Sequence, residues 1–133
     1  MRLLIRILIF GAIFSTSCFD LVSFKDWEED GYYVDINPSN PNSHTLYVEI
    51  ESNSGLGLVD YVKEIGSNDE YIIVKCSLNG STAADQYFVL PKEYPRVDFK
   101  YKSNILGPFD LSRFRMIEES LEIQDIVFDT KID

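Results

Sequence analysis

The sequence predicts an α+β fold that is mainly β: a small antiparallel sheet, connected as a meander, with one C-terminal helix. Short segments rich in β-branched and aromatic residues follow one another along the chain, as expected for strands. The gaps between them are too short for the crossover helices that parallel strands need, which favours antiparallel pairing. Near the C-terminus the apolar residues change to helical spacing. At 133 residues the chain is long enough for one domain with one core.

The expected strands alternate apolar and polar residues or combine aromatic with β-branched ones. They are Tyr32–Ile36, Leu46–Ile50, Val59–Ile65, Tyr71–Leu78, Gln86–Leu90 and, as a candidate sixth, Val97–Tyr101. Segment 37–43 has two prolines and no large apolar residue, so it is expected to be a loop. Turns are expected at 52–55, at 66–69 and at Asn79–Gly80, because both residues of an Asn-Gly pair tolerate positive φ.

One helix is expected after Gly107–Pro108, a dipeptide that is expected to end the preceding strand. Asp110 is placed to accept hydrogen bonds from the first free amides of that helix. The helical spacing is carried by Leu111, Phe114, Ile117 and Leu121. Ile123–Phe128 is a candidate last strand.

The N-terminus has the order of a secretory signal peptide. Arg2 and Arg6 precede eight apolar residues at 7–14, and the small residues 15–17 come next, followed by Cys18. Eight residues cannot cross a bilayer, which needs roughly 20. The sequence therefore predicts a signal peptide at 1–17, followed by a tether at 18–30 and a single β-rich domain at 31–133. Trp27, inside this tether, is interpreted as packing at the edge of the core, with a membrane-facing position as the alternative.

Segment 15–18 resembles the bacterial lipobox, in which small residues precede a lipidated cysteine; Ser15 stands where that motif usually has an aliphatic residue. The resemblance implies cleavage before Cys18, diacylglycerol on its sulfur and further fatty acylation, such as palmitate, on the new amino terminus. Two or three acyl chains anchor a protein firmly to a membrane. The expected product is a lipoprotein of the bacterial cell envelope, with plain secretion as the alternative.

The formal net charge is −10, and it becomes about −12 once the two arginines of the signal peptide are removed. No run of Lys and Arg opposes this charge, so nucleic-acid binding is not expected. Lipidation of Cys18 leaves Cys76 without a partner in the chain, which excludes a disulfide framework. Alternation in the strand around it puts Cys76 beside Ile72 and Val74, so we expect a buried, unreactive thiol. The alternative is a reactive thiol or one that pairs between chains.

The sequence offers little chemistry for catalysis or for cofactors. His44 is the only histidine, and its polar surroundings predict a solvated loop position rather than a general base. Zinc would need more His and Cys ligands, and the alternating acidic loop that binds calcium is absent. The acidic groups at 28–30 and 69–70 are expected to be solvated. No phosphate-binding glycine loop and no distinguished carboxylate pair appears, so we expect no enzyme, no metal and no cofactor.

Tyrosine is abundant, and it combines apolar area with a polar tip, as binding surfaces require. Tyrosines are also ordinary strand residues, so a binding surface and a structural use both stay open. The eight are Tyr32, Tyr33, Tyr47, Tyr61, Tyr71, Tyr87, Tyr94 and Tyr101.

The order of segments resembles a family of small, uncharacterised bacterial lipoproteins. The resemblance lies in Gly31–Val34, Val59–Val62, Asp69–Lys75, Gln86–Leu90 and Gly107–Phe109. It implies the architecture described above and no assigned activity or catalytic residue. The functional hypothesis is a membrane-anchored, non-enzymatic module that binds an envelope protein or another envelope component. The alternative is an acidic immunity or inhibitor lipoprotein that blocks a basic toxin or hydrolase.

Overall fold

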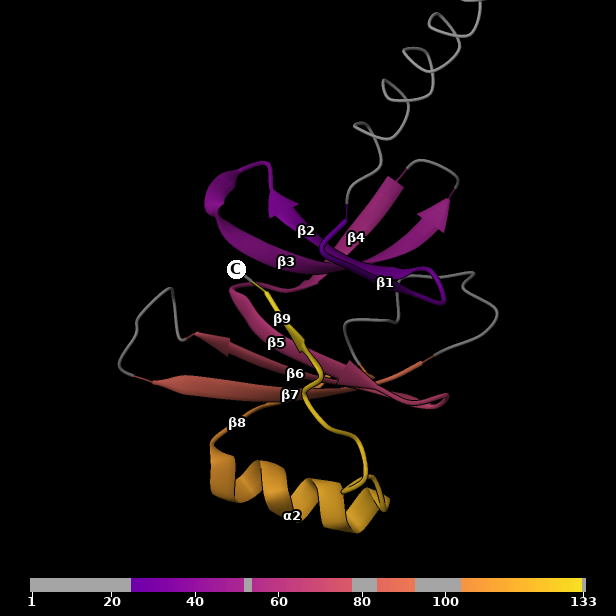
Figure 1. Cartoon of the computed structure of the whole chain (residues 1–133), viewed down its shortest axis with the longest axis vertical. Helices are drawn as coiled ribbons and strands as arrows, with labels where there is room; N and C mark the ends of the chain where they lie inside the picture. The colour runs from indigo at the N-terminus through magenta and orange to yellow at the C-terminus, as the bar shows by residue number, and fades with distance from the viewer. Residues whose placement is uncertain (1–24, 52–53, 78–83, 93–103, 133) are drawn as a thin grey trace, which may run out of the picture.

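The computed structural model describes residues 25–51, 54–77, 84–92 and 104–132, which form two antiparallel sheets and one helix in three layers (Figure 1). Sheet A follows the chain order, with β1 (Trp27–Glu29), β2 (Tyr32–Asn37), β3 (Asn40–Glu51) and β4 (Ser54–Val59). Sheet B has the order β8–β7–β6–β5–β9. Its strands are β5 (Val62–Ser67), β6 (Tyr71–Ser77), β7 (Asp85–Pro91), β8 (Leu106–Phe109) and β9 (Thr130–Lys131).

The helix α2 (Leu111–Leu121) lies on the face of sheet B that points away from sheet A (Figure 1). Asp110 caps it as expected, because its Oδ1 accepts a hydrogen bond from the Arg113 amide at 2.8 Å. Glu122 ends it in the left-handed conformation, with φ of 58°. The predicted fold class, mainly β with a C-terminal helix, is therefore confirmed, with the strands divided between two sheets.

Two clusters of buried side chains hold the layers together. The larger cluster fills the space between the sheets and contains Tyr32, Val34, Leu46, Val48 and Val59 from sheet A, with Val62, Ile65, Ile72, Val74, Cys76 and Leu90 from sheet B. The smaller cluster lies between sheet B and the helix and contains Ile73, Tyr87, Val89, Phe114, Ile123 and Ile126. Sheet B is therefore buried on both faces, which explains the continuous apolar run in β6.

The expected strand Val59–Ile65 is wrong, because β4 ends at Val59 and β5 begins at Val62 in the other sheet. Asp60 and Tyr61 form the link, and Tyr61 has a positive φ of 57°. The link changes the phase of the apolar alternation, because Val59 and Val62 are three residues apart and both enter the core between the sheets. Tyr61 continues the alternation from Val59, which made the segment resemble one strand.

The expected loop at 37–43 is also wrong in its extent. Pro38 and Ser39 make the turn, and β3 already begins at Asn40. The two prolines are compatible with this early start of β3, because Pro38 lies in the turn and Pro41 lies at the beginning of the strand. His44 is consequently a strand residue paired with Ile36 and not a loop residue.

The C-terminal prediction of a strand at Ile123–Phe128 is wrong as well. Ile126 donates its amide to the Ile123 carbonyl at 3.0 Å, so the chain turns and both side chains enter the cluster under the helix. Only Thr130–Lys131 pair, as β9. Gly107 and Pro108 lie within β8 rather than between elements. Gly107 has φ of 127°, and a Cβ there would lie 2.7 Å from the Tyr87 carbonyl oxygen.

Two further expectations concern the start of the domain and the sixth strand. Residues 27–29 were expected to belong to the tether, but they form β1. Trp27 packs against the core between the sheets, as expected for a residue at the edge of the core. The candidate strand Val97–Tyr101 lies outside the described residues, and so does the Asn79–Gly80 turn.

Candidate functional site

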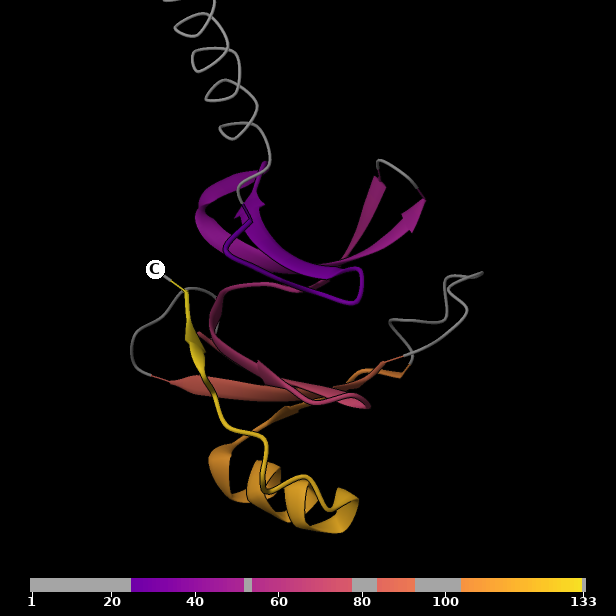
Figure 2. The ribbon, with the colours of Figure 1, turned by 45° about the vertical axis from the view of Figure 1, so that its right-hand side comes forward.

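The outer face of sheet A, directed away from sheet B, carries a stacked pair of tyrosines. Tyr33 and Tyr47 are register partners on β2 and β3, and their ring centroids are 5.2 Å apart with an angle of 20° between planes. The adjacent strand provides glycines where the rings lie. A Cβ at Gly55 would be 2.0 Å from the Tyr33 hydroxyl oxygen, so a side chain there would displace that ring. Figure 2 shows that no described element covers this face.

The Lys25 side chain of the same protein packs against the Tyr33 ring of this pair. The Lys25 Nζ lies 4.4 Å from the Tyr33 ring centroid and 3.5 Å from a Glu28 carboxylate oxygen. Burial raises the pKa of Tyr33, and the negative groups of Tyr47, Glu49 and Asp35 raise it further. The same acidic groups that disfavour a phenolate would favour a positive charge at this surface.

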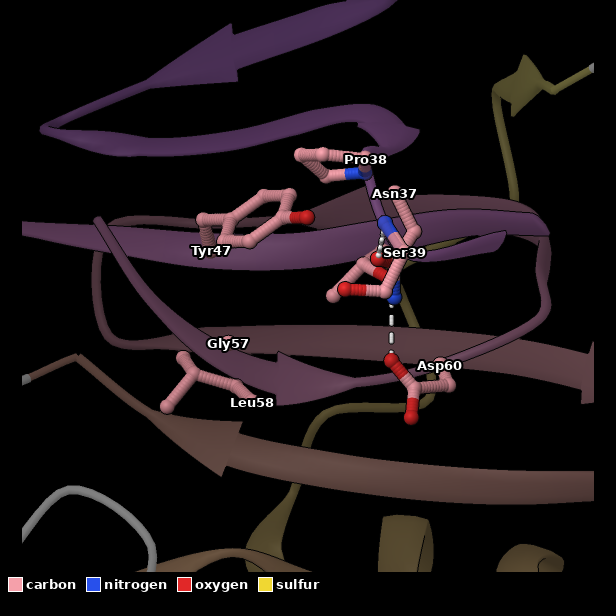
Figure 3. A pocket seen from close by; sticks show the side chains of 8 residues that line it. Asn37, Pro38, Ser39, Tyr47, Gly57, Leu58 and Asp60 are labelled. Atoms are coloured by element: carbon pink, nitrogen blue, oxygen red, sulfur yellow. Dashed lines mark hydrogen bonds between the residues drawn. The ribbon is translucent and has the colours of Figure 1, made fainter. Parts of the chain in front are cut away.

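A cavity of about 440 Å³ opens beside Tyr47 (Figure 3). Tyr47 lines the cavity, whereas Tyr33, which is stacked on Tyr47, does not. The lining residues combine one aromatic ring, small apolar groups and several polar groups. They are Asn37, Pro38, Ser39, Thr45, Tyr47, Gly57, Leu58 and Asp60.

A chain of hydrogen bonds fixes the polar end of the cavity. Asn37 Nδ2 donates to Thr45 Oγ1 at 3.1 Å, and Thr45 Oγ1 donates to Asp60 Oδ1 at 2.8 Å, as the dashed lines in Figure 3 show. Thr45 is only 1% exposed, which explains why its hydroxyl needs both partners. This chain joins the β2–β3 turn to the link between the two sheets.

Tyr61 holds that link in place and thereby positions Asp60. Its amide donates to Ser43 Oγ at 3.3 Å, and its hydroxyl accepts from Asn40 Nδ2 at 3.2 Å. These contacts compensate for the positive φ of Tyr61 by tying it to β3 on two sides. Asp60 therefore presents its carboxylate at the cavity from a fixed backbone.

His44 lies on a different side of β3 from this cavity. Its Nε2 is 3.2 Å from Asp26 Oδ2, and its side chain is 16% exposed. The expectation of a solvated loop histidine is therefore wrong, because β3 begins before His44 and Asp26 lies beside it. A second, smaller cavity of about 290 Å³ includes His44, Ser43, Tyr61 and Lys63 in its lining.

The outer face of sheet A that carries Tyr33 and Tyr47 is called the tyrosine face here, and the other residues singled out by the sequence are separate from it. Cys76 is buried as expected, and burial raises the pKa of its thiol to about 12. Two of the acids at 28–30, Glu29 and Asp30, pair with Lys92 while their side chains stay 39% and 49% exposed, and Asp69 and Glu70 are exposed as expected. Cys18 and the signal peptide lie outside the described residues. Within the described ranges no group of three or more His, Cys, Asp or Glu residues could hold a metal ion.

Of the eight tyrosines, only some are available for binding. Tyr32 and Tyr87 are buried in the two clusters, Tyr33 and Tyr47 form the stacked pair, and Tyr94 and Tyr101 lie outside the described residues.

The sequence did not reveal two residues of the cavity, Thr45 and Asp60. Asp60 was hidden within an expected strand, and its proximity to Thr45 depends on the link between the sheets.

No protein-family model, no curated protein and no solved structure matches this chain. Among the described residues, no helix has the length and apolar character to cross a membrane.

Proposed function

We propose that this protein is a membrane-anchored lipoprotein of the bacterial envelope and that it works as a non-enzymatic binding module. Lipid on Cys18, after removal of residues 1–17, would attach the domain to the membrane. The observation that supports the binding role is the outer face of sheet A. That face combines a stacked tyrosine pair with a cavity of fixed polar groups.

The position of Lys25 supports a binding face close to the membrane. Lys25 contacts the Tyr33 ring, so the chain enters the domain on the side of the tyrosine face. Residues 18–24 connect this point to the anchor and span at most about 25 Å when extended. A ligand on the tyrosine face would therefore be another component near the membrane surface, such as an envelope protein.

The acidic inhibitor or immunity lipoprotein is the second candidate. Asp35, Glu49 and Asp60 give the outer face of sheet A the charge that a basic toxin or hydrolase would meet. An inhibitor that uses the whole acidic surface would lose affinity steeply as salt is added, whereas a partner that places a single cation on the tyrosine face would lose much less. Titrating the isolated complex between 50 mM and 500 mM sodium chloride distinguishes the two.

The anchor and the binding face have separate tests. The intact mass of the membrane-extracted protein should begin at Cys18 and include acyl chains, and Cys18→Ala should abolish both. An unmodified mass that starts elsewhere would contradict the anchor.

For the binding face, a photo-crosslinking amino acid is placed at Glu49, an exposed residue of the outer face. The control position is Met116, 63% exposed on α2. We expect a defined crosslinked product from position 49 in living cells that position 116 does not give and that Tyr47→Leu removes. Equal products from both positions would contradict the proposed binding face.

A further inference from the structure

We propose that the cavity beside Tyr47 receives an arginine side chain from a basic segment of the partner protein. The guanidinium would lie against the Tyr47 ring and pair with the Asp60 carboxylate. This inference rests on the proposed binding function and adds the chemistry of the partner to it.

The first support is the way in which the tyrosine pair already holds a cation. Lys25 Nζ lies 4.4 Å from the Tyr33 ring centroid, and Tyr47, whose ring centroid is 5.2 Å from that of Tyr33, lines the cavity. One ring of the pair therefore binds a cation from the chain itself, and the other presents the same kind of aromatic surface to the cavity.

The second support is the charge of the cavity. Its eight lining residues include one carboxylate, that of Asp60, and no basic side chain. Thr45 donates to Asp60 Oδ1, and no described residue donates to Asp60 Oδ2. A ligand with several donors would find acceptors here, and one with a positive charge would also neutralise the carboxylate.

Shape favours guanidinium over ammonium. Arginine has a planar group that stacks on aromatic rings and also pairs with carboxylates through several donors. A cavity of about 440 Å³, with a ring on one side and a carboxylate at the end, matches this combination. The Lys25 ammonium, 4.4 Å from the Tyr33 ring centroid, is the point-charge form of the same interaction.

The test measures binding of fluorescently labelled hexa-arginine, hexa-lysine and hexa-glutamate peptides to the full chain, extracted in a non-ionic detergent, at 150 mM sodium chloride. We expect hexa-arginine to bind at least fivefold more tightly than hexa-lysine, and hexa-glutamate not to bind. Asp60→Asn should weaken hexa-arginine binding about tenfold. This substitution keeps an oxygen that accepts the Thr45 hydrogen bond, so the loss would come from the charge and not from unfolding.

Two further variants separate site binding from general attraction to an acidic protein. Tyr47→Leu keeps the charge and should weaken binding about fivefold. Glu119→Gln removes one charge from the exposed surface of α2 and should change binding less than twofold. Equal losses in Asp60→Asn and Glu119→Gln would overturn the inference, and so would equal affinity for the two basic peptides.

The failure of this inference can be distinguished from the failure of the proposed function. Crosslinks from position 49 to a partner without a basic segment would leave the binding module standing and overturn the arginine site. Binding of an N-acetylglucosamine tetramer, in place of hexa-arginine, with the same loss in Tyr47→Leu, would also overturn the arginine site. Arginine-selective binding without any crosslink from position 49 in cells would support the site and contradict the proposed function.

Discussion

Lys92 ties sheet A to sheet B through ion pairs in which the lysine is buried and the two carboxylates are half-exposed. Its side chain is 1% exposed, and its Nζ lies 3.1 Å from Glu29 Oε1 and 3.0 Å from Asp30 Oδ2. Ser67, at the end of β5, donates its hydroxyl to the other oxygen of Glu29. Burial lowers the pKa of Lys92, but the hydrogen bonds to Asp30 and Glu29 outweigh burial and raise it. The amine therefore stays charged at neutral pH, although it is buried.

We predict that Lys92→Met lowers the free energy of unfolding by about 1–2 kcal/mol. The partners are half-exposed, so the loss is smaller than for a fully buried pair. Because the pKa of Lys92 is raised on folding, its contribution is present below the unfolded value of 10.5 and disappears as pH rises through the folded value. Urea denaturation at pH 7 and pH 11 tests both statements. Lys131→Met, at an exposed lysine of β9, is the matched control and should change stability by less than about 0.5 kcal/mol.

Cys76 should be inert in the native protein. A thiol with a pKa of about 12 is ionised at pH 8 in roughly one molecule in ten thousand, and this one is also buried. We predict that an aromatic disulfide reagent labels the Cys18→Ala protein only after denaturation in guanidinium. Rapid labelling of the native protein, at the rate of a free peptide thiol, would contradict this burial.

At the scale of elements, close contact between backbones determines what the sequence can tolerate. Gly66, in β5, lies against the connection between α2 and β9, and a Cβ there would be 1.9 Å from the Val127 carbonyl oxygen. Gly57, in β4, lies beside Thr45 and Tyr47 at ordinary contact distance, where a Cβ would be 3.6 Å from the nearest atom. The same substitution at the two glycines should therefore have different effects.

We predict that Gly66→Ala lowers the free energy of unfolding by about 2–3 kcal/mol, because the connection to β9 must move. Gly57→Ala should change it by less than about 1 kcal/mol. Thermal or urea unfolding of the two variants measures the difference. If both alanines had the same small effect, the C-terminal connection would not be packed against β5.

How well the elements could be predicted depends on whether their signal is local. β6, β7 and α2 were found because alternation, helical spacing and the Asp110 cap are contained in the segments themselves. The link at Asp60–Tyr61 was missed because Tyr61 continues the apolar alternation from Val59, and the change of phase at Val62 is a weak signal in so short a segment. Its conformation depends on Ser43 and Asn40, which are distant in the sequence. The cavity was missed for the same reason, since Asn37, Thr45 and Asp60 meet only after both sheets have formed.

At the scale of the whole molecule, repulsion among the excess acidic groups destabilises the compact state that the apolar clusters stabilise. The chain has a formal net charge of −10, while its three layers are held by two apolar clusters. Several ion pairs stabilise the fold and so offset part of this repulsion. Among them, Lys63 lies 2.7 Å from Asp85, and this hydrogen bond is the main reason why the pKa of Asp85 is lowered. Salt weakens both the repulsion among the acidic groups and the attraction within these ion pairs. The direction in which stability changes with salt therefore shows which of the two contributions is larger.

We predict that raising sodium chloride from 50 mM to 500 mM at pH 7 increases the thermal unfolding midpoint by about 3 °C. Exposed ion pairs contribute little, whereas the repulsion among excess acids extends over the whole surface. Scanning calorimetry of the domain measures the midpoint. A lower midpoint in salt would mean that the ion pairs, Lys63–Asp85 among them, contribute more than the repulsion removes.

The shortness of β1 has a mechanical consequence for a protein held by its N-terminus. A pull on that end would act first on the contacts of Lys25 with Tyr33 and of Asp26 with His44. It would then open the three register pairs between β1 and β2, beginning at Trp27 and Val34 and ending at Glu29. Opening them would release about 10 Å of chain. The load would then arrive at Glu29 and Asp30, which Lys92 holds to sheet B. The domain would therefore extend a little at low force and resist further extension, while β2, β3 and β4 keep the tyrosine face intact.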